Sequence, residues 1–124
     1  MKKKRLPLAV KDATEQLKAS LTDKGFHIFA EIDHQANAQG VDLDMGASRV
    51  LLFGNPQAGT LLMQQDMFMG LDFPLRLAVV EKDGETWLLY QDSSDYTGLY
   101  QVQGHPVLDK IDALHATLID ELST

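Results

Sequence analysis

Two apolar segments separated by Asp83-Gly84 constrain the fold of this 124-residue chain more than any other feature. Leu75–Lys82 and Glu85–Asp92 have the length and the aliphatic and aromatic content typical of β-strands. An Asp-Gly pair between two strands predicts a tight hairpin turn, in which both central residues take positive φ angles. The two strands are therefore expected to be antiparallel neighbours in an antiparallel or mixed sheet.

Further elements alternate around this hairpin. Strands are expected at Leu6–Val10, Phe26–Asp33 and Arg49–Phe53. Helices are expected at Asp12–Lys24, Pro56–Asp66 and Pro106–Leu122. Asp12 and Asn55 are candidate N-caps for the first two helices, because both residue types are favoured at that position. The order β-α-β-β-α-β-β-α predicts an α+β fold, a single layer of mixed or antiparallel sheet with helices on one face.

The composition is typical of one globular domain with one core. Hydrophobic residues make up 44% of the chain and charged residues 23%, which argues against disorder. Residues 1–11 are interpreted as a basic N-terminal tail with a short edge strand, and residues 12–124 as a single α+β domain. The chain has no cysteine, which excludes disulfides, thiolate metal sites and cysteine nucleophiles.

The charge is unevenly distributed. With four of the 11 basic residues in Lys2–Arg5, the rest of the chain carries 7 basic against 18 acidic side chains. Such a surface repels phosphate backbones, so no nucleic-acid partner is expected. The apolar stretch that follows, Leu6–Val10, is too short for the core of a signal peptide, and no run reaches the roughly 18 apolar residues of a membrane span. A cytoplasmic protein without membrane contact is the expectation.

Strand Phe26–Asp33 alternates in polarity. One face is expected to be buried, with Phe26, Ile28, Ala30 and Ile32, and the other polar, with His27, Phe29, Glu31 and Asp33. A sheet with helices on one face would leave Phe29, Trp87 and Leu89 uncovered on the other. An apolar face of this kind requires a partner subunit or a ligand, and a homodimer is the simplest expectation.

The densest polar cluster is Glu31, Asp33 and His34 at the end of that strand. A carboxylate beside an imidazole is suited to acid–base chemistry, although a solvated strand face and turn explains the same residues. His27 lies about 13 Å from Glu31 along an extended strand, so one strand cannot assemble a metal site from them. No metal and no cofactor are predicted.

Asn55 also has two interpretations. It is as readily explained by helix capping as by contact with a substrate. The free amides of the helix that it opens could bind an anion. His115 lies in the apolar stripe of the last helix and is interpreted as a residue at the edge of the core.

Several short motifs, taken in order, resemble the domain-of-unknown-function-302 family. They are Lys24-Gly25-Phe26, Glu31-Ile32-Asp33-His34 with Ala36, Phe53-Gly54-Asn55-Pro56, Leu71-Asp72-Phe73-Pro74-Leu75, and Asp92 at a strand end. The resemblance covers about residues 12–122. It implies an α+β domain of TATA-binding-protein-like topology that forms a dimer, and it supplies no established activity, substrate or cofactor. Some members carry a cysteine where this chain has Gly54, so thiol chemistry proposed for those members cannot operate here.

The sequence contains none of the common catalytic motifs: no glycine-rich phosphate loop, Rossmann fingerprint, HExxH or GxSxG. We therefore expect a small dimeric domain that binds a small molecule or acts as an accessory protein, with Glu31, Asp33, His34 and Asn55 at the polar end of its site. One alternative is an acid–base enzyme that uses His34 with Asp33. Another is a subunit that interacts only with other proteins.

Overall fold

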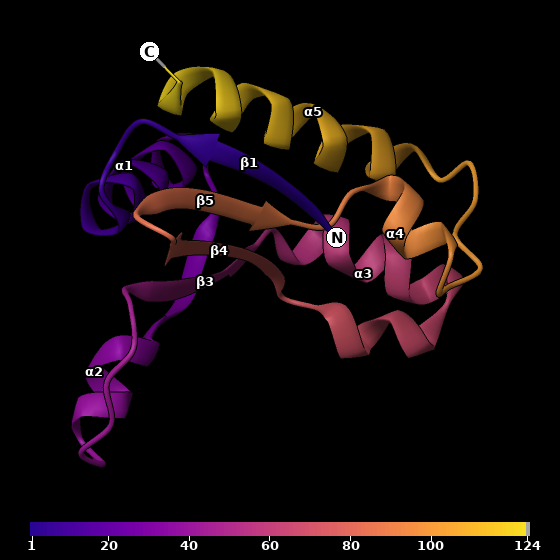
Figure 1. Ribbon diagram of the computed structural model, residues 1–124. Helices are drawn as coiled ribbons and strands as arrows, with labels where there is room; N and C mark the ends of the chain where they lie inside the picture. Colours follow the sequence, from indigo (N-terminus) through magenta and orange to yellow (C-terminus); the bar gives the residue numbers. More distant parts are fainter. Residues whose placement is uncertain (124) are drawn as a thin grey trace.

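In the computed structural model, which describes residues 1–123, five strands form one sheet and helices pack against it (Figure 1). The strands are β1 (Lys2–Leu6), β2 (His27–Asp33), β3 (Ser48–Gly54), β4 (Leu75–Lys82) and β5 (Glu85–Tyr90). The helices are α1 (Val10–Asp23), α2 (His34–Gln39), α3 (Pro56–Gln65), the 3-10 helix η1 (Met67–Asp72), α4 (Ser93–Thr97) and α5 (Pro106–Leu122).

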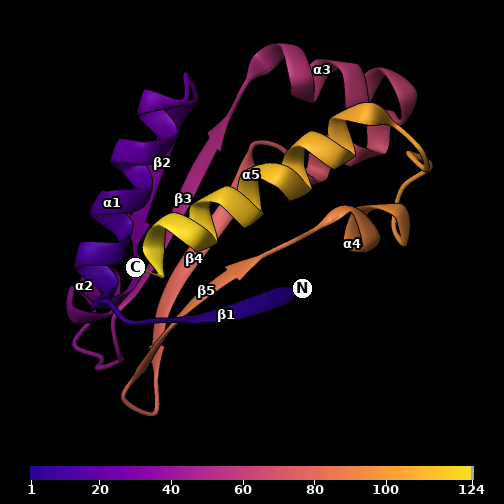
Figure 2. The ribbon, with the colours of Figure 1, turned by 90° about the horizontal axis from the view of Figure 1, so that it is seen from above.

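The sheet has the order β1-β5-β4-β3-β2, and every neighbouring pair is antiparallel. Helices α1 and α5 lie side by side and pack on one face of the sheet (Figure 2). The fold is thus α+β with an open antiparallel sheet, as the sequence predicts. Short helices α2, η1 and α4 lie between the strands and helices that the sequence predicts. No helix among residues 1–123 is long and apolar enough to cross a membrane.

The hairpin turn expected at Asp83-Gly84 is present. Asp83 and Gly84 join β4 to β5 with φ angles of 54° and 77°, as an Asp-Gly hairpin requires. Gly25 follows the end of α1 with φ of 88°, a conformation that glycine adopts at little cost.

The N-terminal segment differs from the prediction. The edge strand is Lys2–Leu6 rather than Leu6–Val10, and it pairs with β5. Its charged side chains have partners that the sequence did not reveal: the Lys3 ammonium lies 5.2 Å from the centre of the Trp87 ring, a cation–π distance. Pro7, which lacks an N–H, ends the strand. Helix α1 then begins at Val10, so Asp12 lies in its first turn and is not its N-cap.

A β-bulge in β2 changes which residues share a face. The register of β2 against β3 shifts between Ile28 and Ala30, so that Ile28 pairs with Phe53, whereas Glu31 pairs with Leu51. Phe53 and Leu51 are both buried under the helices. Glu31 therefore lies on the helix-covered face and Ala30 on the open one, the reverse of the strict alternation predicted. A bulge adds one residue to a strand, which inverts the alternation beyond it.

The second face of the sheet carries no helix. On β2 to β5 its half-buried side chains are apolar: Ala30, Ile32, Val50, Leu52, Ala78, Val80, Trp87 and Leu89. The same face carries the exposed side chains of Lys3 and Arg5 on β1 and of Arg76 on β4. Phe29, at 49% exposure, adds to this outer sheet face. Helix α2 and the loop to residue 47 form an arm that projects away from the side of the sheet on which α5 lies (Figure 1). The arm exposes Val41 and Leu43.

Candidate functional site

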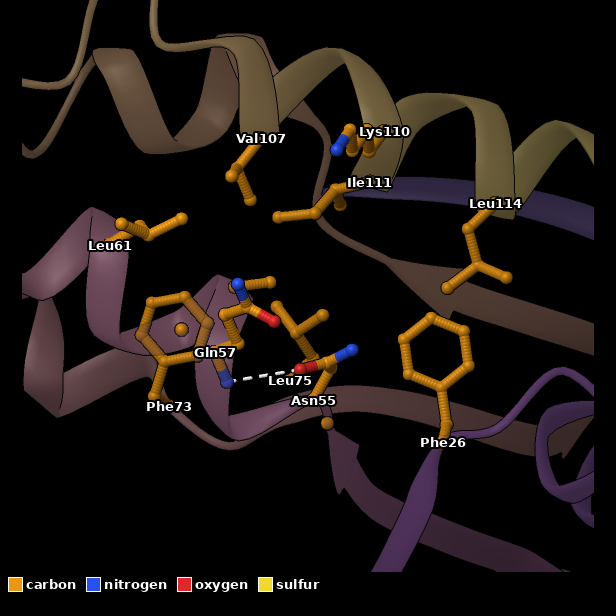
Figure 3. A pocket seen from close by; sticks show the side chains of 13 residues that line it. Phe26, Asn55, Gln57, Leu61, Phe73, Leu75, Val107, Lys110, Ile111 and Leu114 are labelled. Carbon is orange, nitrogen blue, oxygen red and sulfur yellow. Dashed lines mark hydrogen bonds between the residues drawn. The ribbon is translucent and has the colours of Figure 1, made fainter.

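A pocket opens between the β3–α3 junction and α5 (Figure 3). Its volume is about 260 Å³. The lining residues come from the start of β2, from α3 and its flanks, and from α5: Phe26, Gly54, Asn55, Gln57, Ala58, Gly59, Leu61, Phe73, Leu75, Val107, Lys110, Ile111 and Leu114. Most of these side chains are apolar, and the polar groups are few. This combination is typical of sites for small organic molecules.

Asn55 is placed at the pocket by local chain geometry. It is the N-cap of α3, and its side-chain oxygen accepts a hydrogen bond of 3.0 Å from the backbone N–H of Gln57 (Figure 3). Pro56 occupies the first helical turn, where its fixed φ angle suits a helix and its missing N–H costs nothing. The predicted capping role is confirmed. Because the oxygen is used in the cap, the side-chain NH₂ of Asn55 is the group left to face a ligand.

Small residues keep the pocket open. Gly59 is buried on α3, and a methyl group added there would lie 3.5 Å from the Phe73 ring, in ordinary contact. Ala58 also lines the space. Larger side chains at these two positions would occupy the volume that is now empty.

The Glu31 carboxylate is part of an ion-pair cluster between α1 and the sheet. One oxygen lies 2.8 Å from the Lys18 ammonium, and the other accepts a hydrogen bond of 2.9 Å from the Arg49 guanidinium. The hydrogen bond from Lys18 is the main cause that lowers the pKa of Glu31, and Arg49 acts in the same direction. Both oxygens of Glu31 are therefore occupied within the chain.

Asp33 and His34 lie at the base of the arm. Asp33 caps α2 by accepting a hydrogen bond of 2.9 Å from the Ala36 N–H, and it lies 3.5 Å from Arg49. His34 is the first residue of α2 and is exposed. The use of His34 with Asp33 in acid–base chemistry stays a prediction.

The structure does not bring the four predicted site residues together. In the antiparallel β2–β3 pair, Asp33 lies opposite Arg49, whereas Gly54, next to Asn55, lies opposite His27. Six residues of strand separate the two ends, roughly 20 Å. Within one chain, Asn55 thus lies apart from Glu31, Asp33 and His34, and a role of these four residues in ligand binding stays a prediction. Of these residues, only Asn55 lines the pocket.

His115 is buried in α5, as expected for the core edge, and its ring centre lies 5.0 Å from that of Tyr90. Its Nδ1 atom has no hydrogen-bond partner in the described structure. Burial lowers the pKa of His115, although the carboxylates of Asp112 and Asp92 act in the opposite direction. Within residues 1–123, no group of three or more His, Cys, Asp or Glu side chains is placed to hold a metal ion.

Comparison with known proteins gives the family. The sequence model of "Domain of unknown function DUF302" matches residues 2–122. The chain belongs to this family. A crystal structure of an uncharacterized conserved DUF302 protein from Bacillus stearothermophilus has the same fold, with a TM-score of 0.73 over 98% of this chain and 94% of that one. The two sequences are 20% identical, so the likeness concerns the fold alone.

Curated relatives are longer proteins. The proteins named Fluoride-specific ion channel FluC 1 of Brucella suis biovar 1 and of Brucella abortus biovar 1 are each 36% identical to this chain over 85 residues. The match covers 68% of this chain but only 34% and 32% of those proteins. The 85 matched residues thus span about a third of the length of these relatives.

Two lining features of the pocket were missed by sequence reasoning. Lys110 was not singled out, although Val107, Lys110, Ile111 and Leu114 have the i, i+3, i+4, i+7 spacing of one helix face. The polarity pattern of its strand predicts that Phe26 is buried. In the structure it is half-buried and packs edge-on against Phe53, with its ring at the pocket. The position of Lys110 within an apolar stripe of the last helix is the sequence signal that could have indicated the pocket.

Proposed function

We propose that this domain binds a small, mainly apolar molecule in the pocket between the β3–α3 junction and α5. The observation that supports the proposal is the pocket itself. It combines apolar walls from three segments with three polar side chains, Asn55, Gln57 and Lys110. Sites for small ligands have this composition, since apolar contacts supply affinity and a few polar groups orient the molecule.

Filling the pocket tests this proposal. Ala58→Leu would place a larger side chain in the empty volume, and leucine is a good helix former. Wild-type protein should bind at least one of three octyl probes (octanol, octanoate or octylammonium) by isothermal titration calorimetry, and Ala58→Leu should bind none. Ala113→Leu, at an exposed position on α5 outside the pocket lining, is the matched control and should bind as wild type does.

Native mass spectrometry of the protein purified from its host gives an independent test. A reproducible extra mass on the wild type, absent from Ala58→Leu, would support the pocket and give the mass of the natural ligand. An adduct retained equally by both proteins would contradict the proposal, because the ligand would then occupy another part of the molecule.

A second candidate function, that of an accessory protein which pairs with a second copy of itself, is supported by the outer sheet face. This five-stranded face measures roughly 24 Å by 20 Å. The arm beside it exposes Val41 at 67% and Leu43 at 63%. Together they approach the roughly 800 Å² per partner of a stable interface. A two-fold dimer would cover both copies of this apolar surface.

The dimer has its own test. Val80→Glu would place a charge on the central strand of the outer sheet face, whereas Ala113→Glu places one on the solvent side of α5. Sedimentation equilibrium should show a dimer for the wild type and Ala113→Glu, and a monomer for Val80→Glu. A wild-type monomer, or a dimer that Val80→Glu leaves intact, would contradict this assignment. The fluoride-channel relatives, in which the matching region is part of a longer chain, are consistent with an accessory role.

A further inference from the structure

The geometry points to a ligand that carries one anionic head group on an apolar body, and to Lys110 as the side chain that selects the anion. This inference rests on the proposed function of the same pocket and adds the chemical class of its ligand. It depends on the charges of the lining, on the hydrogen-bonding groups left free there, and on the size of the space.

The charge of the pocket lining is opposite to that of the whole protein. The chain has 18 acidic and 11 basic residues, yet the lining includes no aspartate or glutamate and one lysine, Lys110. A pocket for a cation would be expected to contain a carboxylate, which an acidic chain could easily provide. The positive charge at this pocket instead favours an anion.

Lys110 differs from most other basic side chains in having no acidic partner among the described residues. Six of the ten other lysines and arginines are paired with carboxylates within 4 Å, namely Lys2, Arg5, Lys18, Lys24, Arg49 and Arg76. Lys110 forms no ion pair or side-chain hydrogen bond with any of residues 1–123. Its ammonium group, on the α5 side of the pocket, is therefore available to a ligand (Figure 3).

The lining has two other polar side chains, Asn55 and Gln57. The Gln57 carboxamide offers both donors and an acceptor, so it suits many head groups. Asn55 has a preference that matches that of Lys110. The oxygen of the Asn55 carboxamide accepts a hydrogen bond from the Gln57 N–H, so its NH₂ group remains as a donor. Lys110 offers only donors as well. A head group made of acceptor oxygens satisfies both, and hydrogen bonds to an ionised acceptor are stronger than those to a neutral one.

The rest of the pocket fits a short apolar body. Phe26, Phe73, Leu75, Ile111 and Leu114 form its walls. A volume of about 260 Å³ holds roughly eight or nine groups of the size of a water molecule. An eight-carbon carboxylate, octanoate, is therefore a suitable probe, and octanol and octylammonium have the same body with a neutral or a cationic head.

Calorimetric titration of the 124-residue chain with these three probes tests the inference. Lys110→Met keeps the length of the side chain and removes its charge. It should weaken octanoate binding roughly fivefold, as expected for one exposed charge-assisted contact, and should leave octanol binding unchanged. Lys110→Glu should weaken octanoate binding further and strengthen the binding of octylammonium. Lys11→Met, which removes an exposed lysine of α1 outside the pocket lining, should change none of the three affinities.

The results separate this inference from the proposed function. If Lys110→Met changes the affinities for octanol and octanoate by the same factor, the preference for an anion is overturned, but the assignment of the apolar pocket is not. If octylammonium binds to wild type more tightly than octanoate, the sign of the preference is wrong. If none of the probes binds, or if Ala58→Leu binds all of them as wild type does, the pocket assignment itself fails and the ligand class fails with it.

Discussion

Polar side chains lie near both ends of the β2–β3 strand pair, but their interactions within the chain differ. At the arm end, the Glu31 carboxylate is held between Lys18 and Arg49, and Asp33 caps α2. At the pocket end, Lys110 has no partner among the described residues and faces a cavity of about 260 Å³. The comparison shows that polar groups without partners beside a cavity indicate a ligand site. The polar groups of a dense cluster, in contrast, can form all their ion pairs and hydrogen bonds with one another.

The first test of this difference removes a side chain from the pocket wall and another from the arm. Ile111→Ala removes a buried side chain from the pocket wall. It should lower the free energy of unfolding by about 2 kcal/mol, the low end of the range for such substitutions, because the pocket already leaves space beside the residue. Leu43→Ala, on the exposed arm, should change it by no more than about 0.5 kcal/mol. Urea denaturation followed by circular dichroism measures both, and equal losses would show that the arm is packed as firmly as the pocket wall.

The second test compares the two helix caps. Asn55→Ala removes the cap of α3, a helix with buried Gly59 and Leu62, and should cost about 1 kcal/mol of global stability. Asp33→Ala removes the cap of α2, which has no buried residue. Its effect should be smaller, about 0.5 kcal/mol or less, and should be local. Hydrogen exchange should then be faster in the arm alone for Asp33→Ala, whereas a loss of protection throughout the sheet would contradict the distinction.

The third test uses the pH at which each region loses stability. The pKa of His115, in α5, is lowered by burial, so the unfolded chain takes up a proton before the folded protein does. Stability should therefore fall as the pH drops below the ordinary histidine value of about 6.5. His115→Leu should remove this loss between about pH 7.5 and pH 5.5. Thermal unfolding at the two pH values measures this loss of stability. An equal loss in His115→Leu would show that other groups cause it.

The sequence was sufficient for the parts of the fold that depend on local signals. Asp83-Gly84 favours a tight hairpin turn and Asn55-Pro56 favours a helix start, and the structure has both features at the predicted positions. Non-local features were missed. The bulge in β2 is a property of pairing with β3, and its inversion of Glu31 and Ala30 has no counterpart in the polarity pattern of the strand.

The candidate site was less predictable than the fold because it, too, depends on contacts between residues far apart in the sequence. The proximity of His34 and Asp33 in sequence suggested a site, but antiparallel pairing placed Asn55 at the far end of the strands. Lys110 reaches the pocket only because α5 packs across the β3–α3 junction, a contact between segments about 50 residues apart. Such contacts depend on how the whole core packs, so no short motif in the sequence predicts them.

The smallest expected effect concerns the ion pairs of Glu31. Glu31→Gln removes the charge that Lys18 and Arg49 share. Because these side chains are partly exposed, the substitution should cost only about 0.5 kcal/mol at neutral pH, and less in high salt. The pKa of Glu31 is lowered in the folded protein, so its contribution is present above the ordinary glutamate value and is lost as the pH falls through the folded pKa, below about 4.5.

This window lies below that of His115, so one pH series on the wild type and the two variants separates the two regions. Octanoate affinity gives the decisive control. Glu31→Gln should leave it unchanged, since the arm end does not line the pocket. A change as large as that caused by Lys110→Met would mean that the two ends of the strand pair act together, and the distinction between a satisfied cluster and a free site would no longer hold.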